Sequence, residues 1–248
     1  AAAVMAESGV DCLITLGGDG TNRAAVAGTR NLPMVAISTG TNNVFPTMVE
    51  GTLAGLAAGL VAGGRLDLAE VSVSSKILNV YVDGELRDIA LIDVALSKER
   101  FVASKAIWDM DTLFEVFLTR AEPASIGLSS IGARLEAVSL ADEGGLRYSI
   151  ADSEEPEDGP SRTVLAPIAP GVVPPVVISS WQRMADGERY SIVKRDCTVA
   201  LDGERAFSVN RTQQLEIEVR RDGPPIIDVE LALKVAAAQG LFDLAQGN

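Results

Sequence analysis

The first part of the chain alternates short apolar runs with segments of helical pattern. The apolar runs of strand length are residues 12–16 and 33–37. The predicted helices are residues 1–7, 22–28 and 51–62. Continuous apolar strands separated by helices are typical of a parallel sheet covered on both faces. The pattern predicts a doubly wound α/β domain over residues 1–65, incomplete here, because the chain opens within a helical pattern and such domains have more strands.

After this domain, many short apolar runs alternate with polar residues and turn signals. The predicted strands are residues 66–74, 77–82, 86–97, 133–140, 146–150, 163–168, 176–180, 190–193, 197–201, 206–209 and 214–220. Asp-Gly pairs at 83–84 and 202–203 predict hairpin turns. The pattern is typical of an antiparallel β-sandwich over residues 66–228.

Two further helices are predicted, at residues 106–118 and 229–244. The first interrupts the strands of the sandwich. The second opens the final segment, 229–248, which we expect to pack back on the first domain.

The composition defines the kind of core and argues against several classes of partner. Of the 248 residues, 47% are hydrophobic but only 4% are aromatic, so the core is aliphatic. The net charge of −13 argues against nucleic acid or an anionic membrane as the main partner. No apolar run reaches the ~18–20 residues that span a bilayer. Two distant cysteines in apolar runs favour a reducing, cytoplasmic location.

Histidine is absent from the chain. This excludes Ser-His-Asp triads, Cys-His dyads and zinc sites that contain histidine. Any general base must therefore be a carboxylate, a lysine, a tyrosine or a cysteine. If a metal ion takes part, carboxylate and water ligands point to Mg²⁺.

Two polar loops that contain glycine follow the two predicted strands of the first domain. Their residues are Gly17, Gly18, Asp19, Gly20 and Thr21, and then Ser38, Thr39, Gly40, Thr41, Asn42 and Asn43. Consecutive parallel strands end at one edge of the sheet, where open α/β sheets bind ligands. Backbone N–H groups of such a turn bind phosphate at a helix N-terminus. The two loops therefore predict a phosphate-binding cleft, although the Gly-Lys-Ser/Thr ending of a Walker A loop is absent.

Asp19 lies in the middle of the first loop. A carboxylate beside phosphates is electrostatically unfavourable unless it has a chemical role. It could accept a proton from an attacking hydroxyl or hold Mg²⁺-bound water during phosphoryl transfer. The alternative is that Asp19 only forms a tight turn, which is our interpretation of Asp83 and Asp202. The complete pentapeptide, together with the second loop, favours the functional interpretation of Asp19.

Three neighbouring side chains have open interpretations. Arg23, one turn into the helix, either contacts a phosphate or is a solvated surface arginine. Thr41 and Asn42 either hydrogen-bond a ribose or phosphate, or they cap the next helix.

The loops resemble motifs of the ATP-NAD kinase and diacylglycerol kinase superfamily. Residues 17–21 resemble its Gly-Gly-Asp-Gly-Thr signature, and residues 38–43 resemble its second, Gly-Thr-x-Asn loop. Weaker similarities lie at residues 164–170 and 201–204. The longer runs 37–46 and 50–59 are similar to a NAD-kinase-like branch encoded with enzymes of acetoin catabolism.

This resemblance implies an α/β domain followed by a β-sandwich, with the C-terminal segment returning to the first domain. It also implies that Asp19 is the catalytic aspartate and that residues 17–21 bind the phosphates of Mg-ATP. Residues 41–43 would be a second ligand-binding loop. Members of the superfamily commonly self-associate, so the resemblance implies a homo-oligomer.

The chain also departs from NAD kinases. Their Asn-Glu or Asn-Asp pair, which holds the dinucleotide, corresponds here to Ile92 and Asp93, and their histidine after Pro-x-x-Pro is Gly171. Their Thr-Pro-Thr-Gly-Ser-Thr segment is reduced to residues 124–130, which include Ser129. Losing a buried polar contact costs selectivity, so NAD is only one candidate substrate. Asp93 and Ser129 are candidate substrate contacts, and Asp93 is alternatively a structural hairpin residue.

The leading hypothesis is a Mg²⁺-dependent, NAD-kinase-like enzyme that phosphorylates a hydroxyl of a small molecule or nucleotide with ATP. The alternative, from another class, is a nucleotide-binding sensor or regulatory protein that does not catalyse. A third hypothesis is a scaffold for partner enzymes, which predicts no nucleotide binding.

Overall fold

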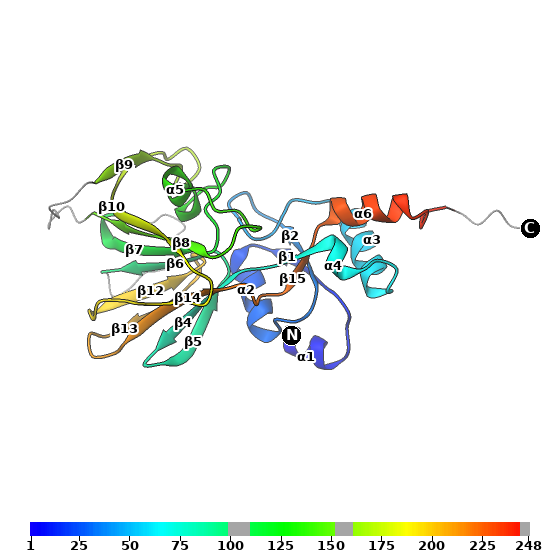
Figure 1. The fold of residues 1–248 in the computed structure, drawn as a ribbon, viewed down its shortest axis with the longest axis horizontal. Helices are drawn as coiled ribbons and strands as arrows, with labels where there is room; N and C mark the ends of the chain where they lie inside the picture. Colours follow the sequence, from blue (N-terminus) through cyan, green and yellow to red (C-terminus); the bar gives the residue numbers. More distant parts are fainter. Residues whose placement is uncertain (99–109, 152–160, 244–248) are drawn as a thin grey trace, which may run out of the picture.

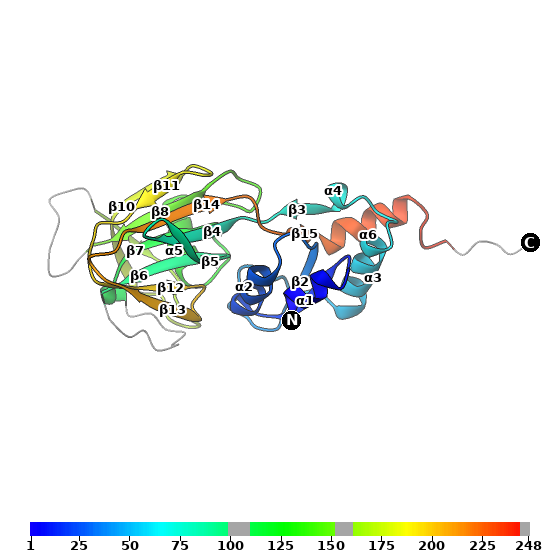
Figure 2. The same ribbon diagram turned by 90° about the horizontal axis from the view of Figure 1, so that it is seen from below.

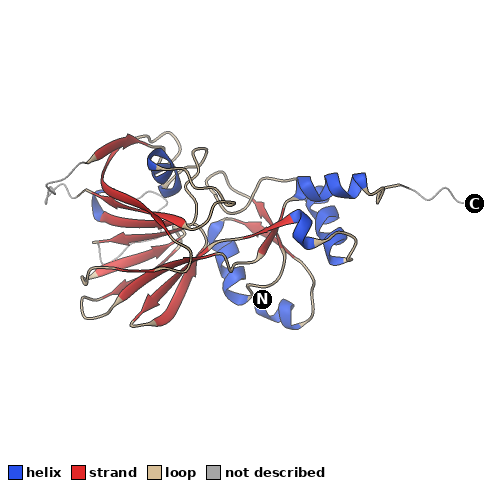
Figure 3. Cartoon of the chain, viewed as in Figure 1, coloured by secondary structure: helices blue, strands red, loops and turns tan. Residues whose placement is uncertain are grey.

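The computed structural model describes residues 1–98, 110–151 and 161–243, which form two domains that lie side by side (Figure 1). Helices surround a short sheet in the first domain, whereas the second consists almost entirely of strands (Figure 3). The predicted fold class, an α/β domain with parallel strands followed by an antiparallel β-sandwich, is confirmed.

The first domain is a four-stranded sheet with helices on both faces. Its elements are α1 (Ala2–Glu7), β1 (Leu13–Gly17), α2 (Asp19–Gly28), β2 (Met34–Ser38), α3 (Gly51–Ala62), α4 (Leu68–Val71), β3 (Ser72–Ser74), β15 (Pro225–Ile227) and α6 (Val229–Ala238). The strand order is β1, β2, β15, β3, and only β3 runs antiparallel to its neighbour. Val26 of α2 packs against Met34 and Ala36 on one face. Helices α3 and α6 pack against Val35 and Ile37 on the other.

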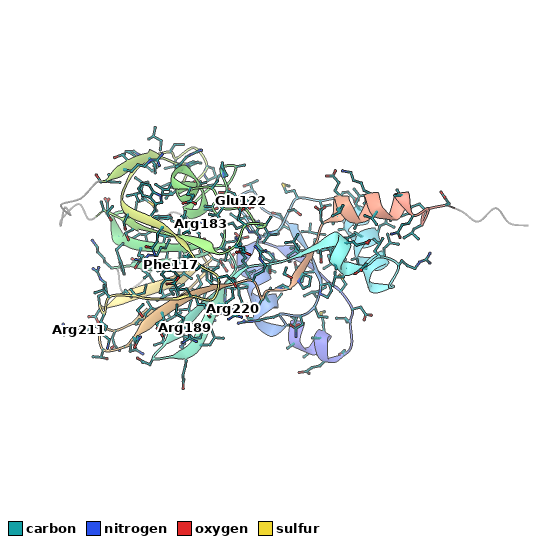
Figure 4. The ribbon with its side chains drawn as sticks, in the orientation of Figure 1. Phe117, Glu122, Arg183, Arg189, Arg211 and Arg220 are labelled. Carbon is teal, nitrogen blue, oxygen red and sulfur yellow. The ribbon has the colours of Figure 1, made fainter. Side chains whose placement is uncertain are left out.

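The second domain packs a seven-stranded sheet against a four-stranded sheet, and each sheet is antiparallel. The larger sheet contains, in spatial order, β13 (Arg205–Val209), β12 (Cys197–Leu201), β6 (Asp93–Ser97), β7 (Leu113–Leu118), β8 (Gly145–Ile150), β10 (Pro175–Met184) and β9 (Arg162–Leu165). The smaller sheet contains β11 (Arg189–Ser191), β14 (Leu215–Arg220), β4 (Ile77–Val82) and β5 (Glu85–Ala90). The buried ring of Phe117 lies in the aliphatic core between them (Figure 4). The helix α5 (Leu128–Leu135) packs against Leu118 and Leu146 of the larger sheet.

Two predicted elements have the wrong type. Residues 113–118 form β7, after the short 3-10 helix η1 (Met110–Thr112), and are not the end of a helix; residues 106–109 lie outside the described residues. In the predicted strand 133–140, residues 133–135 are instead the last turn of α5. The first segment is a short apolar run, in which periodicity does not distinguish a buried strand from a buried helix. The second largely alternates apolar and polar residues, as a strand does, but its first three residues complete the helix that begins at Leu128.

Three predicted boundaries also change. Within the predicted strand 66–74, residues 68–71 form α4, because the carboxylate of Asp67 accepts a hydrogen bond from the N–H of Ala69 and starts a helical turn. The predicted strand 86–97 turns a corner at its centre and becomes β5 and β6. The last helix, α6, ends at Ala238, shortly before Gly240 in the left-handed conformation.

The chain crosses between the domains twice, from β3 into β4 and from β14 into β15 (Figure 2). Strands β3 and β15 pair with each other in the first sheet, although both lie within the segment expected for the sandwich. At the crossing, the N–H of Ser75 donates to the carbonyl of Pro224, and the N–H of Gly223 donates to the carbonyl of Ser75. The two connections therefore form one paired junction.

Lys76 stabilises this junction from within the protein. Lys76 is only 1% exposed. Its Nζ donates to the carbonyls of Ser139, Asp142 and Gly144 at 2.9, 3.1 and 2.9 Å. The ammonium thus holds the loop between α5 and β8 against the start of β4. Burial lowers the pKa of Lys76 to about 7, and in the charged form all three of its donors are used.

We expect Lys76→Met to lower the free energy of unfolding by about 2–4 kcal/mol, because it removes charged hydrogen bonds and leaves carbonyls without a donor. Urea denaturation measures this change. Lys234→Met is the matched control, since that lysine is exposed on α6 and should matter little. A loss below about 1 kcal/mol for Lys76→Met would show that water replaces the ammonium.

Candidate active site

Both polar loops begin at the same edge of the first sheet. Strands β1 and β2 are parallel and in register, so that Gly17 lies beside Ser38 at their ends. Helix α2 begins at Asp19, three residues earlier than the sequence pattern predicts, with Gly18 as its N-cap. A Cβ at Gly17 would overlap the side chain of Thr21, so this tight turn requires glycine. The first loop is therefore a strand-to-helix turn with its aspartate in the first helical turn.

The carboxylate of Asp19 joins the first loop to the second. Its oxygens accept hydrogen bonds from the backbone N–H of Phe45, at 2.8 Å, and of Val44, at 3.1 Å. Burial raises the pKa of Asp19, while these N–H groups and the nearby Arg120 oppose the rise. Arg120 supports the same segment, because its guanidinium donates to the carbonyl of Val44 and stacks on the ring of Phe45.

A cavity of about 220 Å³ opens beside Asp19, between the two domains. It is lined by loops of the first domain, by the start of α5 and by the turn between β12 and β13. The described residues that line it are Asp19, Asn42, Asn43, Val44, Asp93, Ile126, Gly127, Leu128, Ser129, Ile168, Asp202, Gly203 and Glu204. Four of these residues are acidic, and none is basic. The cleft is therefore lined by acidic residues on one side and by aliphatic residues on the other.

Asp202 also lines this cleft, although its Asp-Gly sequence predicts only a turn. The turn is real, since Asp202 has a φ of 48°. However, its carboxylate is buried and accepts hydrogen bonds from the N–H groups of Leu91, Ile92 and Asp93, at 2.9, 2.8 and 3.1 Å. Asp202 thereby holds the corner between β5 and β6. The weak similarity at residues 201–204 was the only signal that pointed to it.

Asp93 follows directly on that corner, and its side chain enters the cleft. Its Oδ1 is buried and has no hydrogen-bond partner. Burial, and then the negative charge of Asp202, raise the pKa of Asp93 well above its ordinary value. Burial also raises the pKa of Asp202, to about 7, but the N–H groups of Leu91, Ile92 and Asp93 oppose that rise, so the pair holds a proton more readily on Asp93.

Arg23 lies at the domain interface, away from the cavity lining. It is buried, and its guanidinium lies 3.4 Å from the carboxylate of Asp88 on β5 and 4.0 Å from that of Asp202. Asp88 is also paired with Arg205, at 2.6 Å. Arg23 therefore joins α2 to the end of the sandwich that faces the first domain (Figure 2). A buried arginine between two carboxylates differs from both interpretations offered by the sequence.

The other glycines of the first loop are enclosed by the chain itself. A Cβ at Gly18 would lie 2.7 Å from the side-chain oxygen of Asn43. A Cβ at Gly20 would overlap the carboxylate of Glu204, which thus rests against the first turn of α2. A side chain at either position would displace these polar groups from the first turn of α2. Glu204 was not singled out from the sequence as a site residue.

The second loop is held by its own side chains. The amide of Asn43 donates to the hydroxyl of Ser38 at 2.9 Å, and that hydroxyl donates to the carbonyl of Gly40 at 2.8 Å. This arrangement directs Asn42 and Asn43 toward the cavity. The predicted site residues that do not line the cavity are Gly17, Gly18, Gly20, Thr21, Arg23, Thr39, Gly40 and Thr41.

Ser129 lines the cavity, but its hydroxyl is engaged within the chain. It donates to the carbonyl of Arg120 at 3.0 Å and accepts from the N–H of Glu122 at 3.1 Å. Glu122 lies on the side of the sandwich that faces the first domain (Figure 4). Ser129 therefore shapes the connection from β7 to α5.

The described residues contain no group of three or more Cys, Asp or Glu side chains arranged to hold a metal ion. Among the same residues, no helix is both long and apolar enough to cross a membrane.

Two glycine-containing loops at a parallel sheet edge, facing a carboxylate cleft beside a β-sandwich, define a NAD-kinase-like fold. The structure of yeast NADH kinase complexed with NADH has this fold, with a TM-score of 0.54 and 14% identity. The similarity covers 96% of this chain and 68% of the yeast chain.

Comparisons of sequence are more specific. The ATP-NAD kinase N-terminal domain matches residues 1–65, and the acetoin catabolism protein X C-terminal domain matches residues 76–222. Acetoin catabolism protein X of Cupriavidus necator is 40% identical over 246 residues, which are 98% of this chain and 67% of that protein. The chain belongs to the acetoin catabolism protein X family.

We expect Asp93→Asn to change how stability depends on pH. The raised pKa of Asp93 in the folded protein means that its favourable contribution is complete at low pH and is lost as pH rises through that pKa. Between about pH 4 and pH 8, urea denaturation should show the wild type losing at least about 1.4 kcal/mol relative to the variant.

Asp83→Asn is the control, because Asp83 is an aspartate of the β4–β5 turn and lies outside the cleft. Its stability curve should run parallel to that of the wild type. If the Asp93→Asn curve also ran parallel, the proton would not reside on Asp93.

Proposed function

We propose that the protein is a phosphotransferase that moves the γ-phosphoryl group of a nucleoside triphosphate to a hydroxyl of an acceptor bound in the cleft. The observation that carries this proposal is the position of Asp19. Its carboxylate stands in the first turn of α2, joins both loops and lines the cavity. A helix N-terminus attracts phosphate, and a carboxylate beside it can act on the hydroxyl that attacks.

In this mechanism the phosphates lie at the N-terminus of α2, and the acceptor lies in the cavity. The acceptor oxygen forms a bond to the γ-phosphorus as the bond from that phosphorus to the β,γ-bridging oxygen breaks, releasing the nucleoside diphosphate. Asp19 takes the proton that the hydroxyl loses. Burial raises the pKa of Asp19, which makes the carboxylate a stronger base.

Mg²⁺ fits this proposal as part of the bound nucleotide. No preformed metal-binding group exists among the described residues. Mg²⁺ commonly keeps several waters and binds through substrate phosphates with one or two carboxylates. Asp19 and Glu204 are cleft carboxylates at the first turn of α2 that could complete such a shell. Bound Mg²⁺ would neutralise charge on the phosphates.

NAD is a candidate acceptor because the yeast protein of the same fold is a NADH kinase. The residue in place of the NAD kinase asparagine, Ile92, argues against it. Ile92 is 1% exposed and packs with Val26, Met34 and Phe45, so it offers no polar group to a dinucleotide.

The second candidate is a nucleotide sensor without catalysis, and the position of Glu204 favours it. Its carboxylate rests against Gly20, where a bound phosphate would profit from the N-terminus of α2. A negative side chain at that point weakens phosphate binding unless it moves away. Displacement of Glu204 would move the β12–β13 turn of the sandwich when a nucleotide binds.

We expect Asp19→Asn to lower the rate of phosphoryl transfer by roughly 10²- to 10⁴-fold. Its affinity for nucleotide should change little, because the asparagine oxygen still accepts the N–H of Phe45. ADP formation with Mg-ATP and a panel of acceptors measures the rate, and calorimetry measures binding.

Asp11→Asn, an exposed change just before β1, is the control and should be fully active. The wild-type rate should fall as pH drops through the pKa of Asp19, which burial raises above an ordinary aspartate. Full activity of Asp19→Asn would refute this mechanism.

We expect Glu204→Gln to bind ADP roughly two- to fivefold more tightly, because a negative charge is removed from the N-terminus of α2. The gain should shrink at high salt. Glu230→Gln is the control, since Glu230 lies in the first turn of α6, far from the cleft. Weaker ADP binding by Glu204→Gln would mean that Glu204 holds the nucleotide and does not oppose it.

A further inference from the structure

We propose that the acceptor bound in the cleft is a small, uncharged compound with adjacent hydroxyl groups, held through Asp93. The phosphorylation of this compound depends on the phosphotransferase activity proposed above, whereas its binding in the cleft does not. Three observations support it: the charge of the cavity lining, the unpaired oxygen of Asp93, and the size and aliphatic wall of the cavity.

The charge of the cleft disfavours an anionic acceptor. Among the described residues that line the cavity, four are acidic and none is lysine or arginine. Two buried arginines behind the lining already face its acidic groups: Arg23 lies 4.0 Å from the carboxylate of Asp202, and Arg120 lies near Asp19. A negative charge on the ligand would therefore meet acidic residues and no basic side chain in the lining itself, and we expect this to weaken binding by roughly tenfold.

The second observation is the buried oxygen of Asp93. Its Oδ1 has no partner within the described chain, although unpaired buried polar atoms are rare in folded proteins. A hydroxyl group both donates and accepts, so it pairs with this carboxyl whether or not the carboxyl carries its proton. A neutral hydroxyl at Asp93 thus completes the hydrogen bonding of the cleft.

Two hydroxyls on adjacent carbons match the two functional carboxyls. Asp19 and Asp93 line the same cavity and are close enough for the charge of Asp19 to act on Asp93. One hydroxyl of the acceptor would pair with Asp93, and its neighbour would lose its proton to Asp19 during transfer. Asp93 is a binding residue in this arrangement, and Asp19 is the base.

The size of the cavity and the apolar wall opposite its acidic residues limit the acceptor further. The cavity volume of about 220 Å³ is below the ~300–1,000 Å³ of sites for drug-sized ligands. Its apolar wall is formed by the side chains of Val44, Ile126, Leu128 and Ile168. This wall fits the carbon skeleton of a short polyol.

The test compares matched neutral and anionic ligands on the wild-type protein. Glycerol and erythritol are the neutral probes, glycerate is the anionic partner of glycerol, and NAD⁺ is the large probe. Ligand-observed NMR measures binding, and ADP formation with Mg-ATP measures transfer. We expect the polyols to bind at least about tenfold more tightly than glycerate and to support ADP formation. Equal binding of glycerate and glycerol, or preferred phosphorylation of NAD⁺, would overturn the assignment.

Asp93→Asn tests the residue itself. We expect polyol binding to weaken by about tenfold while the affinity for ATP stays constant, and Asp83→Asn to change neither. Unchanged polyol binding by Asp93→Asn would also overturn the assignment. Polyol binding without any ADP formation would refute the proposed phosphotransferase and leave the assignment of the ligand class in place.

Discussion

The geometry of the cleft depends on the buried carboxylate of Asp202. It accepts hydrogen bonds from three consecutive N–H groups at the corner between β5 and β6, and it faces Arg23 of the first domain. The same contact therefore shapes the sandwich, places Asp93 at the cavity and brings α2 against the β12–β13 turn. Asp202 takes the left-handed conformation that this geometry requires, which an aspartate tolerates better than a bulky side chain.

The candidate site was predictable from sequence only where its chemistry is local. Asp19 and the two loops are contiguous motifs at the ends of adjacent strands, and the parallel register of β1 and β2 follows from the pattern of the first domain. Asp202 and Glu204 come from more than a hundred residues downstream. An Asp-Gly turn carries the same local signal whether its carboxylate faces solvent or a cleft, so no local pattern identified them.

The fold, too, was predictable from sequence only where its contacts are local. Alternating apolar runs and Asp-Gly turns predict most strands of the sandwich because hairpin pairing is local. The three-residue strand β15 was missed, since its place in the first sheet depends on β2 and β3, which are distant in sequence. The helix predicted over residues 106–118 failed for a different reason. Residues 113–118 are buried almost throughout, and such a run carries no periodicity that separates strand from helix.

The paired junction at Ser75 and Gly223 has a consequence for how this protein is assembled. The sandwich enters and leaves the α/β domain at adjacent points, as an inserted module does. The α/β domain is consequently discontinuous in the gene, and its last strand and helix are synthesised only after the whole sandwich. During translation, the sandwich has all its strands before the first sheet receives β15, so the α/β domain is the last to be completed.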